Sequence, residues 1–217
     1  MVGRITLVGT VHRELGKCNE AQLLGLLKAV DPDVIFEEIR PEDHDRLYKD
    51  EAASTVEIRA IKSYMKMKAV RQVPVDDFAT PQGLKAGADE IFAYAEQSSK
   101  EYCRAVSNID RMAFNHGYNF LSGLAQIELR NKADALLETC ISSSGNARLQ
   151  GLLSAWYIQL RNREEAMLEN IYGFCRMNSF SRGVYLVGAG HMSYIARGLE
   201  ERLEAEPKPV EWCVWSG

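Results

Sequence analysis

Short apolar runs rich in β-branched residues recur near both ends of the chain, and most of them end in polar residues or glycine. Such runs predict strands. Continuous apolar stretches such as Val34-Ile35-Phe36 are typical of strands covered on both faces, as in a largely parallel sheet flanked by helices. The predicted strands occupy residues 4–9, 33–39, 72–76, 183–188 and 210–215.

Apolar residues at helical spacing over residues 19–30 predict a helix, which Asp31-Pro32-Asp33 ends before the second strand. Residues 80–178 contain no strand pattern and predict long helices with breaks near residues 83–87, 115–117 and 142–145. A last helix is predicted at 193–204, before a turn at Pro207-Lys208-Pro209.

These elements predict one α/β domain over residues 1–217. We expect a mostly parallel central sheet of about five strands flanked by helices, with a long helical insertion between the third and fourth strands.

Composition excludes several classes of partner. The 217 residues are 46% hydrophobic and 26% charged, and the formal net charge is −4, so no basic surface for nucleic acid is expected. No run approaches the roughly 18 apolar residues of a membrane span, and no signal peptide is visible, so we expect a cytoplasmic protein without a membrane partner.

The five cysteines include no Cys-x-x-Cys pair, which argues against disulfides and a thiolate zinc site. Whether the chain forms a homo-oligomer is open.

The frame Leu-Val-Gly-x-x-His occurs twice, at residues 7–12 and 186–191, each time at the end of a predicted strand. It contains two of the four histidines, His12 and His191. The glycine is expected to let the backbone turn sharply off the strand. Two neutral imidazoles and one carboxylate form a common ligand set for a catalytic divalent metal, so the repeat predicts a metal site.

Acidic residues end two further strands, Glu37-Glu38 and Asp76-Asp77. Ligands collect beyond the carboxyl ends of parallel strands, so these groups should lie near the histidines. Because side chains alternate along a strand, only one of Glu37 and Glu38 can face a given neighbour. Asp76 could bind a metal or a histidine nitrogen, although helix capping is the simpler interpretation.

The remaining polar candidates have simpler interpretations. The run of residues 161–165 reads by itself as the charged outer face of a helix. His44 lies in a polar stretch and is expected at the surface. His116 could line a pocket, but packing between helices is the more common situation for such a residue.

The two histidine motifs and the strand end at residues 32–38 together resemble the TraB/PrgY/GumN family, which includes the Tiki proteases. More distantly, the chain is similar to the erythromycin-esterase and ChaN-like superfamily, whose fold is an α/β sheet with a helical insertion. The resemblance covers residues 4–46 and 157–199. Members differ in chemistry: Tiki-like proteins resemble metal-dependent peptidases, the esterases cleave a cyclic ester, and ChaN-like relatives are associated with haem.

By this resemblance, His12 and His191 match the family's two Gly-x-x-His histidines, and Glu38, followed by Ile39, matches its strand-end glutamate best. Asn162-Arg163-Glu164 is similar to the family's Asn-Arg-Asp element, with glutamate in place of aspartate. This makes Arg163 a candidate site residue. The family also tends to carry an arginine shortly after the glutamate, a position for which Arg40 and Arg46 compete.

The expected function is hydrolysis of a peptide or a small-molecule ester, with His12, His191 and Glu38 holding Mn, Co, Zn or Fe as a divalent ion. Arg163 would stabilise the oxyanion. Glu37 or Asp76 would carry a proton or orient a histidine. Two alternatives remain: metal-free ester hydrolysis by a histidine and Glu38, and a non-enzymatic regulator that binds haem or another ligand.

Overall fold

The computed structural model describes residues 3–50, 54–77, 80–202 and 210–217, without the side chains of residues 200 and 201. Its five strands lie close to the predicted positions, with boundaries that differ by up to two residues. The strands are β1 (Arg4–Thr10), β2 (Val34–Glu37), β3 (Arg71–Pro74), β4 (Arg182–Gly188) and β5 (Glu211–Val214).

All five strands are parallel and form one sheet in the order β3-β2-β4-β1-β5. The fold class predicted from the sequence is therefore confirmed. Strand β4, from the far end of the chain, lies between β2 and β1 and pairs with both. Its register sets Gly188 beside Thr10 and Leu186 beside Glu37, so the two histidine motifs and the acidic strand end meet at one edge of the sheet.

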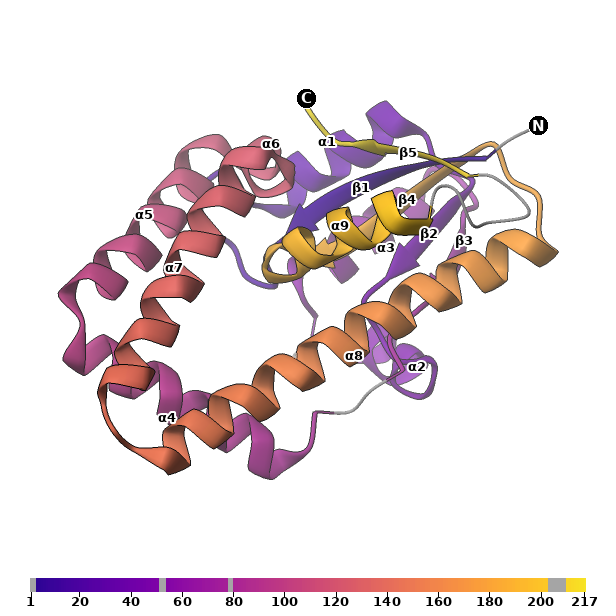
Figure 1. Cartoon of the computed structure of the whole chain (residues 1–217). Helices are drawn as coiled ribbons and strands as arrows, with labels where there is room; N and C mark the ends of the chain where they lie inside the picture. Colours follow the sequence, from indigo (N-terminus) through magenta and orange to yellow (C-terminus); the bar gives the residue numbers. More distant parts are fainter. Residues whose placement is uncertain (1–2, 51–53, 78–79, 203–209) are drawn as a thin grey trace.

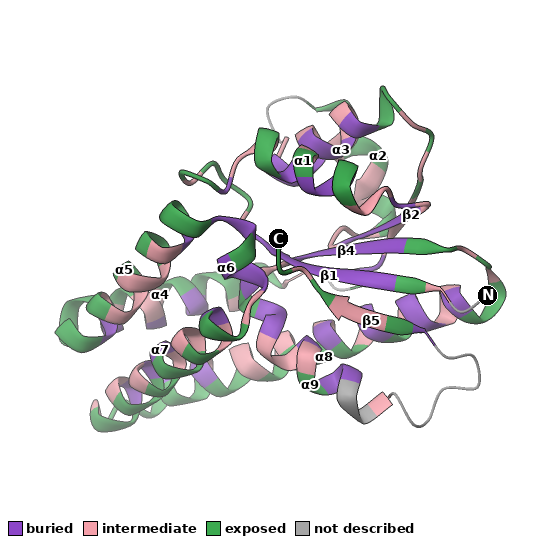
Figure 2. Ribbon diagram, turned by 90° about the horizontal axis from the view of Figure 1, so that it is seen from above, coloured by how far each residue is buried: buried purple, intermediate pink, exposed green. Residues whose placement is uncertain are grey.

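Helices cover both faces of the sheet, which explains the continuous apolar runs. Figure 2 shows α1 (Glu20–Val30), α2 (Pro41–Lys49) and α3 (Val56–Met65) on one side, and α8 (Ala147–Met177) and α9 (Met192–Arg202) on the other. Residues 5–10 of β1 are accordingly all buried. Helices α2 and α3 were not predicted from the sequence, although Thr55 caps α3 through a hydrogen bond from the backbone of Ile58.

The long helical insertion between β3 and β4 is present. It contains α4 (Gln82–Ser98), α5 (Lys100–His116), α6 (Tyr118–Ser122) and α7 (Leu124–Ser143), and it leads into α8. The insertion has a hydrophobic cluster of its own, separate from the core that surrounds the sheet. The members of that cluster include Ile91, Ala95, Tyr102, Leu137, Ile141, Leu149 and Leu153.

Helix α8 connects the two clusters. With 31 residues it is about 46 Å long, enough to run from the tip of the insertion along the sheet. In Figure 1 it is the orange helix that crosses below the sheet. Leu149 and Leu153, near its start, belong to the cluster of the insertion, whereas Met167 and Ile171 belong to the core of the sheet. Arg163 and Glu164 lie between these two segments.

The last predicted helix begins one residue early, at Met192, and its described part ends at Arg202. Its predicted end at Glu204 and the turn at residues 207–209 lie outside the described residues. Over the part of the chain that is described, no helix combines the length and the apolar character needed to cross a membrane.

Candidate active site

The two imidazoles converge beside Glu38 at the carboxyl edge of the sheet. How close these three side chains lie is seen from the position that a Cβ atom would occupy on Gly188. That point lies 3.2 Å from Glu38 Oε2, 3.6 Å from His191 Cδ2 and 3.8 Å from His12 Nε2. Three groups from distant parts of the sequence therefore surround one small space, because β4 is inserted between β1 and β2.

His191 is held on both ring nitrogens. It ends the short 3-10 turn η1 (Ala189–His191) that follows β4, and its side chain is only 10% exposed. Its Nδ1 lies 2.6 Å from Glu164 Oε1, and its Nε2 lies 3.2 Å from Glu38 Oε1. Burial lowers the pKa of His191, but the two carboxylates outweigh it and raise the pKa to about 9.

His12 makes a similar contact in a different environment. Its Nδ1 lies 3.2 Å from Glu57 Oε1 on α3, but its side chain is 61% exposed. The hydrogen bond to Glu57 raises the pKa of His12 above its ordinary value. For Glu57, burial raises the pKa, but the contact with His12 brings it below its usual range. Both histidines thus have Nδ1 on a glutamate, which leaves Nε2 to face the shared space.

Glu38 is the strand-end carboxylate that joins the site. It accepts hydrogen bonds from the Gly188 backbone N–H at 2.7 Å and from Arg163 Nη2 at 2.9 Å. Burial raises the pKa of Glu38, yet His191, the Gly188 N–H and Arg163 together lower it to about 2. The carboxylate of Glu37 has different partners, as strand alternation requires. It accepts from Tyr48 Oη at 2.6 Å and from Gln72 Nε2 at 3.0 Å, so it orients neither His12 nor His191.

Arg163 connects Glu38 with Asp76. Its Nη2 donates to Asp76 Oδ2 at 2.8 Å as well as to Glu38, and its side chain is 14% exposed. Burial lowers the pKa of Arg163, but the two carboxylates raise it above its ordinary value. The outer-face interpretation of residues 161–165 is therefore wrong for Arg163. Asp76 is buried two residues after β3 and binds this guanidinium, whereas the simpler interpretation was that it caps a helix.

The glycines of the repeated frame allow neighbouring groups to approach the backbone closely. Neither Gly9 nor Gly188 has a positive φ angle, so the expected sharp turn is not the reason for them. A Cβ on Gly9 would lie 2.3 Å from the backbone oxygen of Leu121 on α6. A Cβ on Gly188 would instead enter the space between the histidines. Each glycine leaves room for a neighbour that approaches the sheet edge.

The remaining candidates lie outside the site. Arg40 pairs with Glu42 and Asp43, and Arg46 also pairs with Asp43, so neither arginine contacts Glu38. His44 is not a fully exposed surface residue, because its side chain is 19% exposed and stacks on Tyr48. His116 ends α5 and is exposed, so it is not packed between helices.

Sequence reasoning did not assign roles to the two glutamates that hold the histidines. Glu164 follows Arg163 directly, so the helix that carries the arginine also carries the partner of His191. Glu57 lies among the buried residues Val56, Ile58 and Ile61 of α3. A lone carboxylate in an apolar helix segment is a signal for a buried partner, and it could have indicated Glu57.

A cavity of about 170 Å³ opens beside His12. Its walls include Glu37, Glu38 and Glu57 together with aliphatic side chains from α2, α3, β4 and the segment just after β2. The aliphatic members are Ile39, Leu47, Ile58, Ile61 and Leu186.

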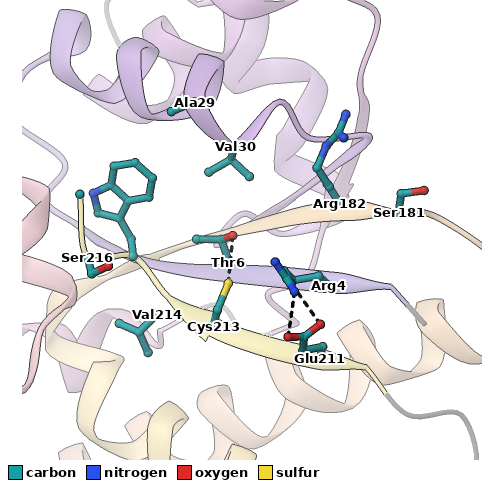
Figure 3. A pocket seen from close by; sticks show the side chains of 12 residues that line it. Arg4, Thr6, Ala29, Val30, Ser181, Arg182, Glu211, Cys213, Val214 and Ser216 are labelled. Atoms are coloured by element: carbon teal, nitrogen blue, oxygen red, sulfur yellow. Dashed lines mark hydrogen bonds and ion pairs between the residues drawn. The ribbon is translucent and has the colours of Figure 1, made fainter. Parts of the chain in front are cut away.

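A larger hollow of about 690 Å³ lies away from the histidines, between the end of α1 and the edge strand β5 (Figure 3). Its charged groups are already paired. Arg4 donates to both carboxylate oxygens of Glu211, and Arg182 donates to Asp31. Thr6 and Cys213 contact each other on its floor. Because the described charged groups of this hollow are paired, the smaller cavity, which has a histidine and three glutamates in its wall, is the better candidate for a substrate.

The fold and the site define an α/β protein with a histidine pair and a shared carboxylate at the carboxyl edge of a parallel sheet. Comparison with protein-family models, curated proteins and solved structures finds no significant match to this chain. The resemblance to the TraB/PrgY/GumN family therefore stays a prediction from the motifs, and the geometry of the site carries the functional argument.

Proposed function

We propose that this protein is a metal-dependent hydrolase that cleaves a peptide or ester bond at the site formed by His12, His191 and Glu38. One observation carries the proposal. Both histidines have Nδ1 on a glutamate, at 3.2 Å for Glu57 and 2.6 Å for Glu164, while Nε2 faces the space beside Glu38. A carboxylate on the outer nitrogen of a histidine is the usual partner of a metal-ligating imidazole, since it fixes the ring and raises its basicity.

The donor set fits a divalent ion of the Mn, Co, Zn or Fe type, since it combines two imidazoles with one carboxylate. Over the described residues, no group of three His, Cys, Asp or Glu side chains is already arranged to hold a metal. His191 Nε2 lies instead against Glu38 Oε1. The three side chains already share one space, so loading requires the contact between His191 and Glu38 to open and His191 to lose a proton.

When bound, the ion lowers the pKa of a water molecule and polarises the scissile carbonyl group. The protein supplies the remaining functions. Glu57 and Glu164 fix the two imidazoles, and Arg163 orients Glu38 while placing positive charge near the developing oxyanion. Glu37 lines the cavity beside His12, whereas Asp76 is not among its lining residues. Of the two carboxylates, Glu37 is therefore the better proton carrier.

The pKa values disfavour metal-free hydrolysis by Glu38. A carboxylate whose pKa is about 2 is a weak base near neutral pH. His191, with its pKa raised to about 9, is already protonated there and cannot accept a proton from water. Only His12 would be left to act as the base, and the contact with Glu57 raises its pKa as well.

The non-enzymatic alternative stays a prediction. At about 170 Å³ the cavity beside His12 is smaller than the roughly 300–1,000 Å³ of typical ligand pockets, which gives haem no support at this position. A Soret band on titration with haem would favour that alternative.

Isothermal titration with Mn²⁺, Co²⁺ or Zn²⁺, combined with elemental analysis, tests the metal site. We expect one ion to bind per chain, and we expect His12→Ala and His191→Ala each to weaken binding by about a hundredfold or more. Turnover of peptide and ester substrates should be lost in parallel. Exposed His116 is the matched control, so His116→Ala should change neither property.

Full metal binding and full turnover in both His12→Ala and His191→Ala would overturn the proposal. Turnover that persists after complete chelation, in protein shown by elemental analysis to be metal-free, would favour the metal-free alternative.

A further inference from the structure

The cavity beside His12 has a buried acceptor that no described group satisfies. Glu57 is 8% exposed, and its Oε1 contacts His12. The hydroxyl of Thr10 helps to lower the pKa of Glu57, yet the buried Oε2 has no hydrogen-bond partner among the described residues. A buried carboxylate oxygen without a donor costs free energy, so a ligand that supplies a donor would be favoured here.

The charge of the cavity is negative. Three glutamates, Glu37, Glu38 and Glu57, line it, and no lysine or arginine is among its described lining residues. Glu38 has its charge compensated by Arg163, and Glu37 accepts hydrogen bonds from Tyr48 and Gln72. Glu57 Oε2 is thus the acceptor left for a ligand. A cationic donor suits it better than a neutral one, because charge-assisted hydrogen bonds are the stronger kind.

Much of the remaining wall is aliphatic, beside His12, Thr10 and Thr55. Ile58 and Ile61 come from α3, Leu47 from α2, and Leu186 from β4. A volume of about 170 Å³ suits one small apolar group and not an extended ligand. The cavity therefore joins an apolar half to an anionic half within the reach of one amino acid.

Resting on the proposed hydrolase function, we propose that this cavity binds the amino-terminal residue of a peptide, with its ammonium group on Glu57 Oε2 and an aliphatic side chain against Leu47 and Ile61. The protein then acts on the first peptide bond. Water adds across that bond: its oxygen bonds to the acyl carbon, the C–N bond breaks, and the leaving amine takes the proton. The products are one aliphatic amino acid and a peptide shortened by one residue.

Binding to the metal-free protein tests the subsite separately from catalysis. The probes are L-leucinamide, 4-methylpentanamide, which lacks the amino group, and glycinamide, which lacks the side chain. We expect L-leucinamide to bind about tenfold or more tightly than either of the others, as measured by NMR chemical-shift titration near neutral pH. Equal affinity for L-leucinamide and 4-methylpentanamide would overturn the proposal.

Variants at Leu47 locate the subsite. Leu47→Trp fills the cavity and should weaken L-leucinamide binding by about tenfold or more, whereas Leu124→Trp, at a position 77% exposed on the insertion, should not. Leu47→Ala enlarges the cavity and should shift the preference toward L-phenylalaninamide. This second variant keeps the test valid if the tryptophan variant fails to fold. Unchanged affinities in Leu47→Ala would overturn the assignment.

Turnover separates this inference from the proposed function. With metal added, L-leucine 4-nitroanilide should be hydrolysed at least about tenfold faster than its N-acetyl derivative. Hydrolysis of both at equal rates would overturn the subsite and leave the hydrolase in place. Selective binding of L-leucinamide without turnover of any peptide or ester would support the subsite and count against the hydrolase.

Discussion

The same six-residue frame begins near the end of β1 and of β4, yet the two histidines that close it have opposite environments. The His191 side chain is 10% exposed and touches two carboxylates, whereas that of His12 is 61% exposed and touches one. The chain after Gly188 turns through η1 directly into α9, which packs His191 against α8. The chain after Thr10 continues into an irregular segment at the surface. A repeated sequence therefore does not imply a repeated role.

This difference in environment suggests that the two histidines have different roles in the proposed site. His191 belongs to a buried network of charges with Glu38, Glu164, Arg163 and Asp76, so changes there should affect stability as well as chemistry. His12 lines the cavity and its side chain is mostly exposed, so changes there should affect binding and leave the fold nearly intact.

Removal of the central carboxylate should have the largest effect. Glu38→Ala leaves His191 and Arg163 buried without their shared partner and should lower the free energy of unfolding by about 3–5 kcal/mol. Glu57→Ala, on the side of His12, should cost only about 1 kcal/mol. Urea unfolding of the metal-free proteins measures both. Equal costs would remove the distinction between the two sides.

Substitutions of the two glycines in the repeated frame should also differ in their effects on stability and metal binding. Gly9→Ala forces a methyl group against the Leu121 backbone oxygen, which cannot move without α6, so it should destabilise the fold by about 3 kcal/mol. Gly188→Ala meets the Glu38 side chain and should cost about 1 kcal/mol or less, but it should weaken metal binding. Thermal unfolding and metal titration of both variants test this. A larger loss of stability in Gly188→Ala would contradict it.

The pH dependence of stability should follow His191. Its pKa rises from an ordinary 6.5 to about 9 in the folded protein, so the folded state holds the proton more tightly. This stabilisation is fully present below pH 6.5 and is lost as the pH rises toward 9. Urea unfolding of the metal-free protein across this range should show a decline, and Glu164→Gln should flatten it. Stability that stays constant or rises would exclude the proton-sharing network.

The smallest effect is expected at the arginines after β2. Arg46 is exposed and pairs only with Asp43 among the described residues, so Arg46→Ala should change stability by less than about 0.5 kcal/mol. Its metal binding should equal that of the wild type. Arg163→Ala provides the contrast, since it removes the partner of Glu38. A strong effect of Arg46→Ala on metal binding would reopen the assignment of the site arginine.

The fold was largely predictable because its signals are local. Apolar runs such as Val34-Ile35-Phe36 mark strands covered on both faces, and Asp31-Pro32-Asp33 marks the end of α1. The short helices α2 and α3 were not predicted; in α2, Leu47 and Tyr48 are the only large apolar residues among residues 41–49. The edge of the sheet where His12, His191 and Glu38 meet was also predictable, since parallel strands place their carboxyl ends together.

The contacts that each site residue makes were harder to predict from the sequence. Alternation along β2 requires Glu37 and Glu38 to face opposite sides, but it cannot say which of them meets β4. The pairing of Arg163 with Asp76 depends on the path of a 31-residue helix that begins in the insertion. The glycines were placed correctly as special positions and explained wrongly, because close approach by α6 is invisible in the sequence around Gly9.

By itself, the sequence determined the element types, the parallel sheet and the edge at which the polar groups gather, because these follow from local patterning and from the geometry of strands. Only the tertiary structure decided which glutamate holds each histidine, how deeply each imidazole is buried and what lines the cavity. Those properties depend on the insertion of β4 between β1 and β2 and on the packing of α3 and α8, which bring together residues that are far apart along the chain.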